Sequence, residues 1–295
     1  AVKTSLAEQK ITSGTFFFDI IAKQIKYPVA VKAGRYEIKE GMSLFRLIRM
    51  LRSGNQAPVN LVITKLRTKE DLAQKIAANF EIDSAGFISL LNDPDILRNY
   101  KLDTNIVMTA VIPNSYSMLW NTSASKIFGK LYNEKEKFWN EERRQKAKAL
   151  QLTPGQVYSM ASIVEEETNK AEDKGKIASV YMNRIAAGMK LEADPTVKFA
   201  MKDFGLKRIM HKHLEYPSPF NTYRNYGLPP GPICTPSIKT IDAVLDAPQT
   251  NYIFFVAKPD FNGYSNFAAT YAEHLVYAKA YQQALDSLVK AKAAK

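Results

Sequence analysis

The chain contains very little cysteine or histidine. Its 295 residues include one cysteine, Cys234, and three histidines, His211, His213 and His274. One thiol cannot form a disulfide within the chain. An isolated His-x-His pair without neighbouring cysteines is not typical of a zinc centre. We therefore expect neither a disulfide framework nor a catalytic metal or other cofactor. We interpret Cys234 as a bystander and His211 and His213 as surface residues.

Long apolar runs are also missing. A membrane-spanning helix needs ~20 consecutive apolar residues, whereas the longest runs here are short pieces such as residues 252–257. The sequence has neither an initiator methionine nor a charged-then-apolar leader. From these two features we expect an extracytoplasmic domain that has been separated from its targeting segment.

Acidic residues are outnumbered by basic ones. The chain has 41 Lys and Arg against 29 Asp and Glu, which gives a net charge of +12. Such a balance favours polyanions or anionic surfaces as partners. Because no zinc-finger spacing, aromatic RNA-binding motif or basic zipper is present, we expect no nucleic-acid partner. An anionic membrane leaflet or an acidic wall polymer explains the same charge.

Hydrophobic periodicity predicts an α+β protein in two parts. The first part, residues 1–105, alternates short strands and helices. We predict helices over residues 14–27 and 43–52, strands over 34–39 and 58–64, and a helix from a Thr68 cap to Phe80. Gly54 would end the helix over 43–52. An irregular segment over 93–116 marks the expected boundary.

The second part, residues 106–295, is predicted to be a mixed α+β catalytic domain. Expected helices cover residues 124–150, with a break near Asn133, a segment that begins at Thr153-Pro154, and residues 172–188 and 266–289. The alanine and aromatic stripe of the last helix is expected in the core.

Three consecutive glutamates end the helix that begins at Thr153-Pro154. At about 100° per residue, Glu165 and Glu167 lie at the two borders of its apolar stripe, and Glu166 points toward water. A carboxyl group against apolar side chains loses hydration, which raises its pKa above ~4.3 and keeps a proton donor near neutral pH. Periodicity leaves Glu165 and Glu167 as candidates. The alternative is a solvated helix end that carries no function.

Three proline-containing segments follow, over residues 193–197, 218–223 and 227–233. Proline biases the preceding residue toward extended structure, so Asp194 and Ser218 are expected outside helices. Polar side chains on such stiff turns are held still, as a binding site requires. The alternative is that these segments are ordinary turns, with Asp194 folded back onto the turn at Thr196.

Taken in their order along the chain, the helix that ends in three glutamates and the three proline-containing segments resemble the endolytic murein transglycosylase family, also called MltG or YceG-like proteins. The resemblance covers roughly residues 30–285, and residues 30–65 resemble a LysM-like glycan-binding module. The matching pieces are ASIVEEET (161–168), YMNRIAAGMKLEADPTVKFA (181–200), SPFNTY (218–223), GLPPGPI (227–233) and YIFFVAK (252–258), with IPNSY (112–116) upstream.

The resemblance implies an endolytic lytic transglycosylase that cleaves the MurNAc-GlcNAc bond of nascent peptidoglycan strands. One glutamate would act as acid and then as base, leaving 1,6-anhydro-MurNAc ends, and the family pattern aligns it with Glu165. It also implies an inner-membrane anchor upstream of the chain, an extracytoplasmic location, and peptidoglycan synthases as candidate partners. The implied cleft residues are Asp194, Thr196, Asn221, Thr222 and Tyr223, with Tyr116 and Tyr223 as flat faces for sugar rings.

One departure and two alternatives accompany this interpretation. Ser265 stands where the family is expected to carry a histidine, although His274 follows nearby. A two-carboxylate glycoside hydrolase would need a second acid ~5–9.5 Å from Glu165, and Asp194 is the candidate. A noncatalytic peptidoglycan-binding protein would bind the wall without cleaving it.

Overall fold

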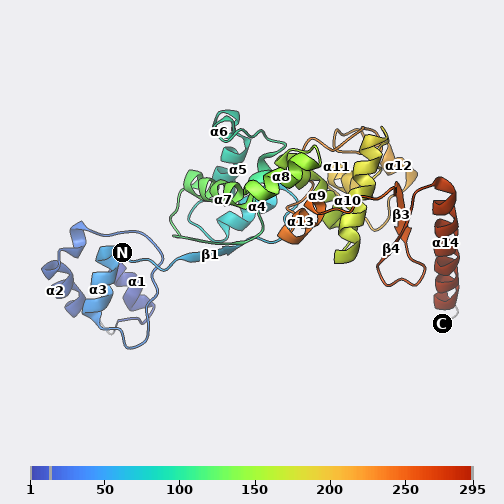
Figure 1. Ribbon diagram of the computed structural model, residues 1–295. Coiled ribbons are helices and arrows are strands. Elements are labelled where there is room, and N and C mark those ends of the chain that lie inside the picture. The colour runs from blue at the N-terminus through green and yellow to red at the C-terminus, as the bar shows by residue number, and fades with distance from the viewer. Residues whose placement is uncertain (1, 13–14, 294–295) are drawn as a thin grey trace.

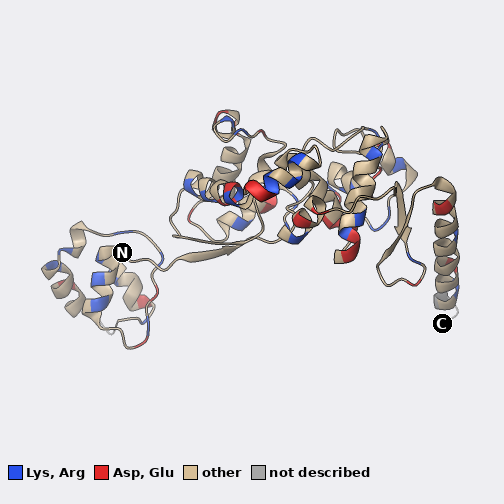
Figure 2. Cartoon of the chain, viewed as in Figure 1, with Lys and Arg blue, Asp and Glu red and all other residues tan. Residues whose placement is uncertain are grey.

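The computed structural model describes residues 2–12 and 15–293. Figure 1 shows an elongated molecule. Three hydrophobic cores follow one another along the chain. Helices dominate, and two small antiparallel sheets accompany them. This confirms the α+β class. Lysine and arginine are distributed over all three parts of the molecule (Figure 2).

The first unit is a small helical cluster. It consists of α1 (Val2–Glu8), α2 (Phe16–Gln24), the 3-10 helix η1 (Tyr27–Val29) and α3 (Leu44–Ser53). The Ser43 side chain caps α3, and Gly54 ends it at a φ of 75°. Residues 34–39 form no strand. Instead of a ladder, the Arg35 carbonyl accepts one backbone hydrogen bond from Ala57. The LysM-like module therefore stays a prediction.

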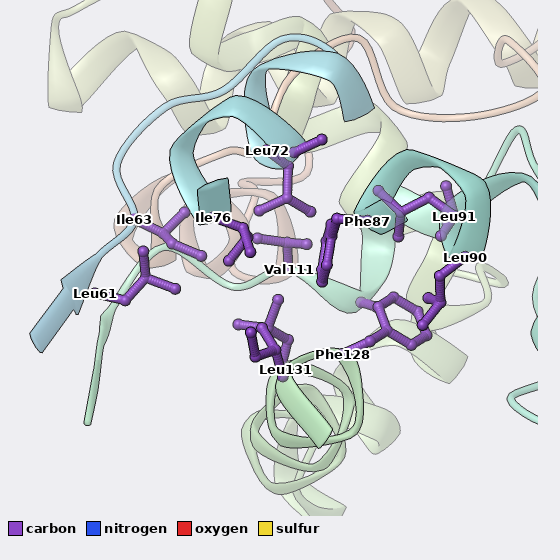
Figure 3. Packing of buried hydrophobic residues seen from close by; sticks show 14 of the residues in the cluster. Leu61, Ile63, Leu72, Ile76, Phe87, Leu90, Leu91, Val111, Phe128 and Leu131 are labelled. Carbon is purple, nitrogen blue, oxygen red and sulfur yellow. The ribbon is translucent and has the colours of Figure 1, made fainter. Parts of the chain in front are cut away.

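The second unit is built around a two-stranded sheet. Strand β1 (Val59–Val62) pairs with β2 (Ser115–Met118), and Leu61 lies opposite Tyr116. The accompanying helices are α4 (Lys69–Ala77), α5 (Ser84–Asn92), α6 (Pro94–Arg98), the 3-10 helix η2 (Val107–Ala110) and α7 (Ala124–Phe138). Their buried side chains form one core, and Figure 3 shows the part of it that β1, α4, α5 and α7 contribute. The expected boundary at 105/106 falls inside this core. The segment expected to be irregular, 93–116, contains α6, η2 and the start of β2.

Capping chemistry explains where two of these helices begin. Thr68 and Asp71 form the reciprocal box that starts α4, as predicted from Thr68. The helix predicted over 124–150 is interrupted at Trp139 and Asn140 instead of near Asn133. Trp139 is buried, and the Asn140 side chain accepts from the Arg143 N–H at 3.0 Å, which starts α8 (Glu141–Ala149).

The third unit packs around α9 (Pro154–Glu167), which a Thr153–Gln156 capping box begins. Around it lie α10 (Ala171–Ala186), α11 (Asp194–Met201) and α13 (Ile238–Leu245), and α12 (His211–Leu214) follows α11 in the chain. Asp194 begins α11, whereas a non-helical position was expected. The first turn of a helix tolerates Pro195 because proline lacks a backbone N–H, and an N–H in that turn would have no partner within the helix.

Direct hydrogen bonds join the second and third units. Leu66 and Thr235 exchange two of them, Thr235 N–H to the Leu66 carbonyl at 2.7 Å and Leu66 N–H to Thr235 Oγ1 at 2.8 Å. The buried Tyr158 hydroxyl donates to the Val111 carbonyl at 2.5 Å. The chain around Leu66 is therefore fixed to Thr235, and α9 is fixed to the chain at Val111.

Gly231 marks a close approach of the backbone between these two units. A Cβ at this position would lie 2.1 Å from the carbonyl oxygen of Asn105. We expect Gly231→Ala to lower the free energy of unfolding by about 1–3 kcal/mol, because backbone has to move. Gly155→Ala is the control, since a Cβ there meets nothing within 4 Å. Urea denaturation measures both. Equal stability of the two variants would contradict the close approach.

The C-terminal part differs most from expectation. Strand β3 (Phe254–Ala257) pairs with β4 (Ser265–Ala268), and α14 (Tyr271–Ala293) follows. The predicted helix over 266–289 starts later because residues 265–268 join the sheet. Its apolar stripe is not core. Leu275 and Val276 are exposed, and α14 lies at the end of the molecule against β3 and β4 (Figure 1).

The described helices can be compared with the length and apolar character of a membrane-spanning helix. Within residues 2–12 and 15–293, no helix combines the length and apolar character that a bilayer crossing requires.

Candidate active site

Glu165, at the end of α9, belongs to an ion pair. Its Oε2 lies 2.8 Å from Lys174 Nζ and accepts hydrogen bonds from Ser237 at 3.1 Å and from Thr240. The Glu165 side chain is 16% exposed and that of Lys174 is 13% exposed. Burial acts to raise the pKa of Glu165, but Lys174 and the two hydroxyls outweigh it, and the net shift is downward. Glu165 is thus ionised at neutral pH, contrary to what its border position suggested.

Glu166 is also held by cations. Its carboxylate oxygens lie 2.9 Å from Lys65 Nζ and 3.1 Å from Arg67 Nη2. The side chain is 17% exposed, so the prediction that it points into water was wrong. The reason is tertiary: the connection between β1 and α4 passes over the end of α9 and supplies both cations.

Glu167 has the environment expected of a proton donor. Oε1 accepts a hydrogen bond of 2.6 Å from the Tyr181 hydroxyl. Desolvation by burial raises the pKa of Glu167 to about 7, the charges of Asp194 and Glu166 act in the same direction, and Tyr181 and Lys198 oppose the shift. Glu167 therefore retains its proton close to neutral pH.

Asp194 and Tyr223 form a second pair near Glu167. The Tyr223 hydroxyl donates to Asp194 Oδ1 at 2.7 Å, so Asp194 is not folded back onto Thr196. Burial, followed by the hydrogen bond to Asp194, raises the pKa of Tyr223, which keeps the hydroxyl protonated. Both residues line a pocket of about 720 Å³. Its other lining residues are Arg208, Ile209, Met210, His211, Lys212 and Leu214.

Three of the expected cleft residues are buried. Thr196 and Thr222 share a hydrogen bond of 2.9 Å, and Thr222 Oγ1 also accepts from the Ala193 N–H. The Asn221 amide donates to the carbonyls of Leu214 and Tyr216, each at 2.9 Å. Thr196 and Thr222 therefore join the loop over 218–223 to the start of α11, and Asn221 joins the same loop to residues 214–216.

Tyr116 does not reach this region. It is 2% exposed, packs in the core of the second unit and donates its hydroxyl to the Ile112 carbonyl. The expectation of a flat face for a sugar ring was therefore wrong for Tyr116. A tyrosine in a short strand, with its ring toward the sheet's buried face, serves packing.

The histidines and the cysteine are only partly as expected. His211 is exposed, but His213 is buried, and its Nδ1 accepts from the Met210 N–H at 3.1 Å. Cys234 is buried and burial raises the pKa of its thiol, so it is not a reactive thiolate. Among the described residues, no group of three or more His, Cys, Asp or Glu side chains could hold a metal ion.

Comparison of the chain with known proteins identifies its family. A family model described as the YceG-like family matches residues 1–280. The chain belongs to the YceG-like family.

Relatives of this YceG-like chain have been named for an activity. An endolytic murein transglycosylase of Bacillus subtilis (strain 168) is 30% identical over 270 residues, which cover 85% of this chain and 73% of the relative. One of Streptococcus pneumoniae serotype 2 (strain D39) is 24% identical over 291 residues, covering 87% of this chain. The chain spans about half, 52%, of that pneumococcal relative.

A solved structure resembles the YceG-like chain over nearly all of its length. The 2.6 Å crystal structure of a YceG-like protein from Listeria monocytogenes matches with a TM-score of 0.64 and 26% sequence identity. The match covers 92% of this chain and 93% of the other.

Ser265, the departure noted above, lies in β4 of the YceG-like chain. Its N–H donates to Asp173 Oδ2 at 2.7 Å. His274 stacks on Phe254 with ring centroids 5.1 Å apart, and so belongs to the contact between α14 and β3. Sequence reasoning did not identify Lys174, Tyr181 or Thr240 as partners of the glutamates. The positions of these three residues in the sequence do not indicate the contacts, because Lys174 and Tyr181 lie in α10 and Thr240 lies in α13.

Proposed function

We propose that this chain is an endolytic lytic transglycosylase of peptidoglycan, with Glu167 as its general acid and base. The observation that carries the proposal is a carboxyl group with a pKa of about 7 beside the Asp194–Tyr223 pair. The names of the curated relatives support the substrate class. The ion pair of Glu165 with Lys174 favours Glu167 over Glu165 for the acid role.

The proposed reaction needs one carboxyl group and no water. Protonated Glu167 donates its proton to the oxygen of the MurNAc-GlcNAc bond. As the bond from this oxygen to MurNAc C1 breaks, its electron pair stays on the oxygen. The resulting carboxylate takes the proton of the C6 hydroxyl of the same MurNAc, and O6 bonds to C1. The 1,6-anhydro ring forms, and Glu167 is protonated again.

Tethering explains why a second catalytic carboxylate is not required. The attacking hydroxyl belongs to the reacting ring, so its effective concentration is large without help from the protein. Asp194 and Tyr223 would then bind hydroxyl and acetamido groups of the sugars. Ser237, Thr240 and Lys174 would keep Glu165 ionised and the end of α9 in place.

Asp194 also supports the competing hydrolase. The charge of Asp194 raises the pKa of Glu167, so the two carboxyl groups interact electrostatically. Two-carboxylate glycosidases likewise use a pair of neighbouring acidic side chains. Mass spectrometry of digested peptidoglycan separates the two reactions. Anhydro ends support the transglycosylase, reducing ends support the hydrolase, and intact strands with retained binding support a noncatalytic wall-binding protein.

The pH dependence of cleavage should follow Glu167. Because its protonated form starts the reaction, we expect kcat/KM to decrease about tenfold per pH unit above pH 7. The hydrogen bond from Tyr181 lowers the pKa of Glu167, so Tyr181→Phe should move this decline to higher pH. Rates of anhydro-end release across pH 5–9 measure both effects. Activity that rises through pH 8 would refute the acid role.

The proposal also concerns location and partners. Peptidoglycan strands lie outside the cytoplasmic membrane, so we propose that this chain acts there. An inner-membrane anchor upstream and a peptidoglycan synthase as partner are further parts of the proposal, which come from the resemblance. Fractionation of cells that produce the whole protein, followed by crosslinking to synthases, tests them.

A further inference from the structure

We propose that the basic wall of the Asp194–Tyr223 pocket binds the carboxylates of the stem peptide on the MurNAc residue being cleaved. The inference rests on the proposed function and adds a substrate preference to it. Arg208, His211 and Lys212 line this pocket together with Asp194 and Tyr223. They come from the segment between α11 and the loop over 218–223.

The charges on this wall are available to a ligand. Arg208, His211 and Lys212 are exposed. In the part of the chain that the structure describes, Lys65, Arg67 and Lys174 are each ion-paired with a glutamate of α9, whereas Arg208 and Lys212 form no ion pair. The pocket thus presents two cations and an imidazole, against one carboxylate at Asp194.

The sugar backbone of a peptide-bearing strand does not need such a wall, because GlcNAc is uncharged and the lactyl carboxyl group of MurNAc forms the amide bond to the peptide. The acidic groups of the polymer are the carboxylates of the peptide, which is attached through the lactyl ether at C3 of MurNAc. This carbon belongs to the ring whose C1 reacts. A MurNAc whose bond lies at Glu167 therefore carries its peptide close to the catalytic carboxyl, where the pocket lies.

The residue types fit carboxylates. An arginine guanidinium can donate two parallel hydrogen bonds to one carboxylate, and a lysine ammonium supplies a compact charge with three donors. The wall should therefore favour strands that keep their peptides over strands that have lost their peptides and whose freed lactyl carboxylates are capped as methylamides. Because these groups are exposed, the preference should weaken as the salt concentration rises.

The test compares two substrates and three proteins. The substrates are uncrosslinked peptidoglycan strands with their peptides and denuded strands, in which an amidase has removed the peptides and the freed lactyl carboxylates have been converted to methylamides. The proteins are the wild type, Arg208→Ala with Lys212→Ala, and a control with the same charge change, Lys148→Ala with Lys207→Ala. Both control lysines are exposed and lie outside the pocket lining.

We expect wild type to release anhydro ends from peptide-bearing strands with a kcat/KM about five- to tenfold higher than from denuded strands, the range expected for a few charge-assisted contacts. The pocket double variant should bring this ratio near 1 while keeping its rate on denuded strands. The control should keep the wild-type ratio. A wild-type ratio of 1, or equal losses on both substrates in the pocket variant, overturns the inference.

A binding measurement separates this inference from the proposed function. A soluble muramyl tripeptide is titrated into wild type and the pocket double variant, with N-acetylmuramic acid methyl ester as the ligand without peptide. Weaker tripeptide binding in the variant, by about five- to tenfold, supports the subsite even if the chain cleaves nothing. Equal binding of the tripeptide to both proteins overturns it. Cleavage of either substrate decides the proposed function independently.

Discussion

Glu167→Gln is expected to reduce the release of anhydro-MurNAc ends from intact sacculi by about 10²–10⁴-fold, the usual contribution of a general acid. Glutamine has the same size and its amide oxygen can still accept the hydrogen bond from Tyr181. It cannot transfer a proton to the glycosidic oxygen. Mass spectrometry of the soluble products, at equal protein concentrations, measures the effect.

The fold of this variant can be checked through its stability. The pKa of Glu167 is raised in the folded state, so its contribution to stability is complete at low pH and is lost as pH rises through about 7. Removing the ionisable group should leave Glu167→Gln as stable as wild type or more stable at pH 8. A well-folded variant with unchanged turnover would remove Glu167 from the mechanism.

Glu165→Gln is expected to lower stability, by about 3 kcal/mol at pH 7, the lower end of the range for breaking a buried ion pair. The change leaves the Lys174 ammonium, with its side chain 13% exposed, without its countercharge. The pKa of Glu165 is lowered by folding, so its stabilisation is present above the ordinary value of 4.5 and is lost as pH falls below it. Thermal unfolding at pH 7 and pH 3 should show a large difference from wild type at the first and a small one at the second.

A matched control and an activity assay complete this experiment. Glu142→Gln removes an ion pair with Lys146 in which the glutamate is 71% exposed, and it should change the unfolding temperature little. Below its unfolding temperature, Glu165→Gln should retain substantial cleavage. If its turnover is lost as completely as that of Glu167→Gln while its unfolding temperature is unchanged, the acid role returns to Glu165.

The local features of the fold were predictable from sequence because local chemistry determines them. Thr68 and the Thr153-Pro154 pair begin the helices predicted from them, and the 218–223 and 227–233 segments form loops. Periodicity also located the three glutamates at the end of one helix. Each of these inferences depends on residues within a few positions of one another.

What sequence could not supply was the surroundings of each side chain. Helical spacing placed Glu165 and Glu167 at the two borders of the same apolar stripe. In the structure, Glu165 contacts Lys174 and Thr240, whereas Glu167 contacts Tyr181. Thr240 lies 75 positions from Glu165 in the chain. Polar residues on stiff loops were expected to face substrate, but Asn221 mostly satisfies backbone carbonyls.

The contact of Lys65 and Arg67 with Glu166 limits how the protein can be dissected. A fragment that starts at residue 106 would lose β1, leave β2 without its neighbour and strip both countercharges from the carboxylate next to Glu167. The smallest fragment expected to keep this site therefore starts at about residue 58, and residues 106–295 cannot be separated from β1 without disturbing the end of α9.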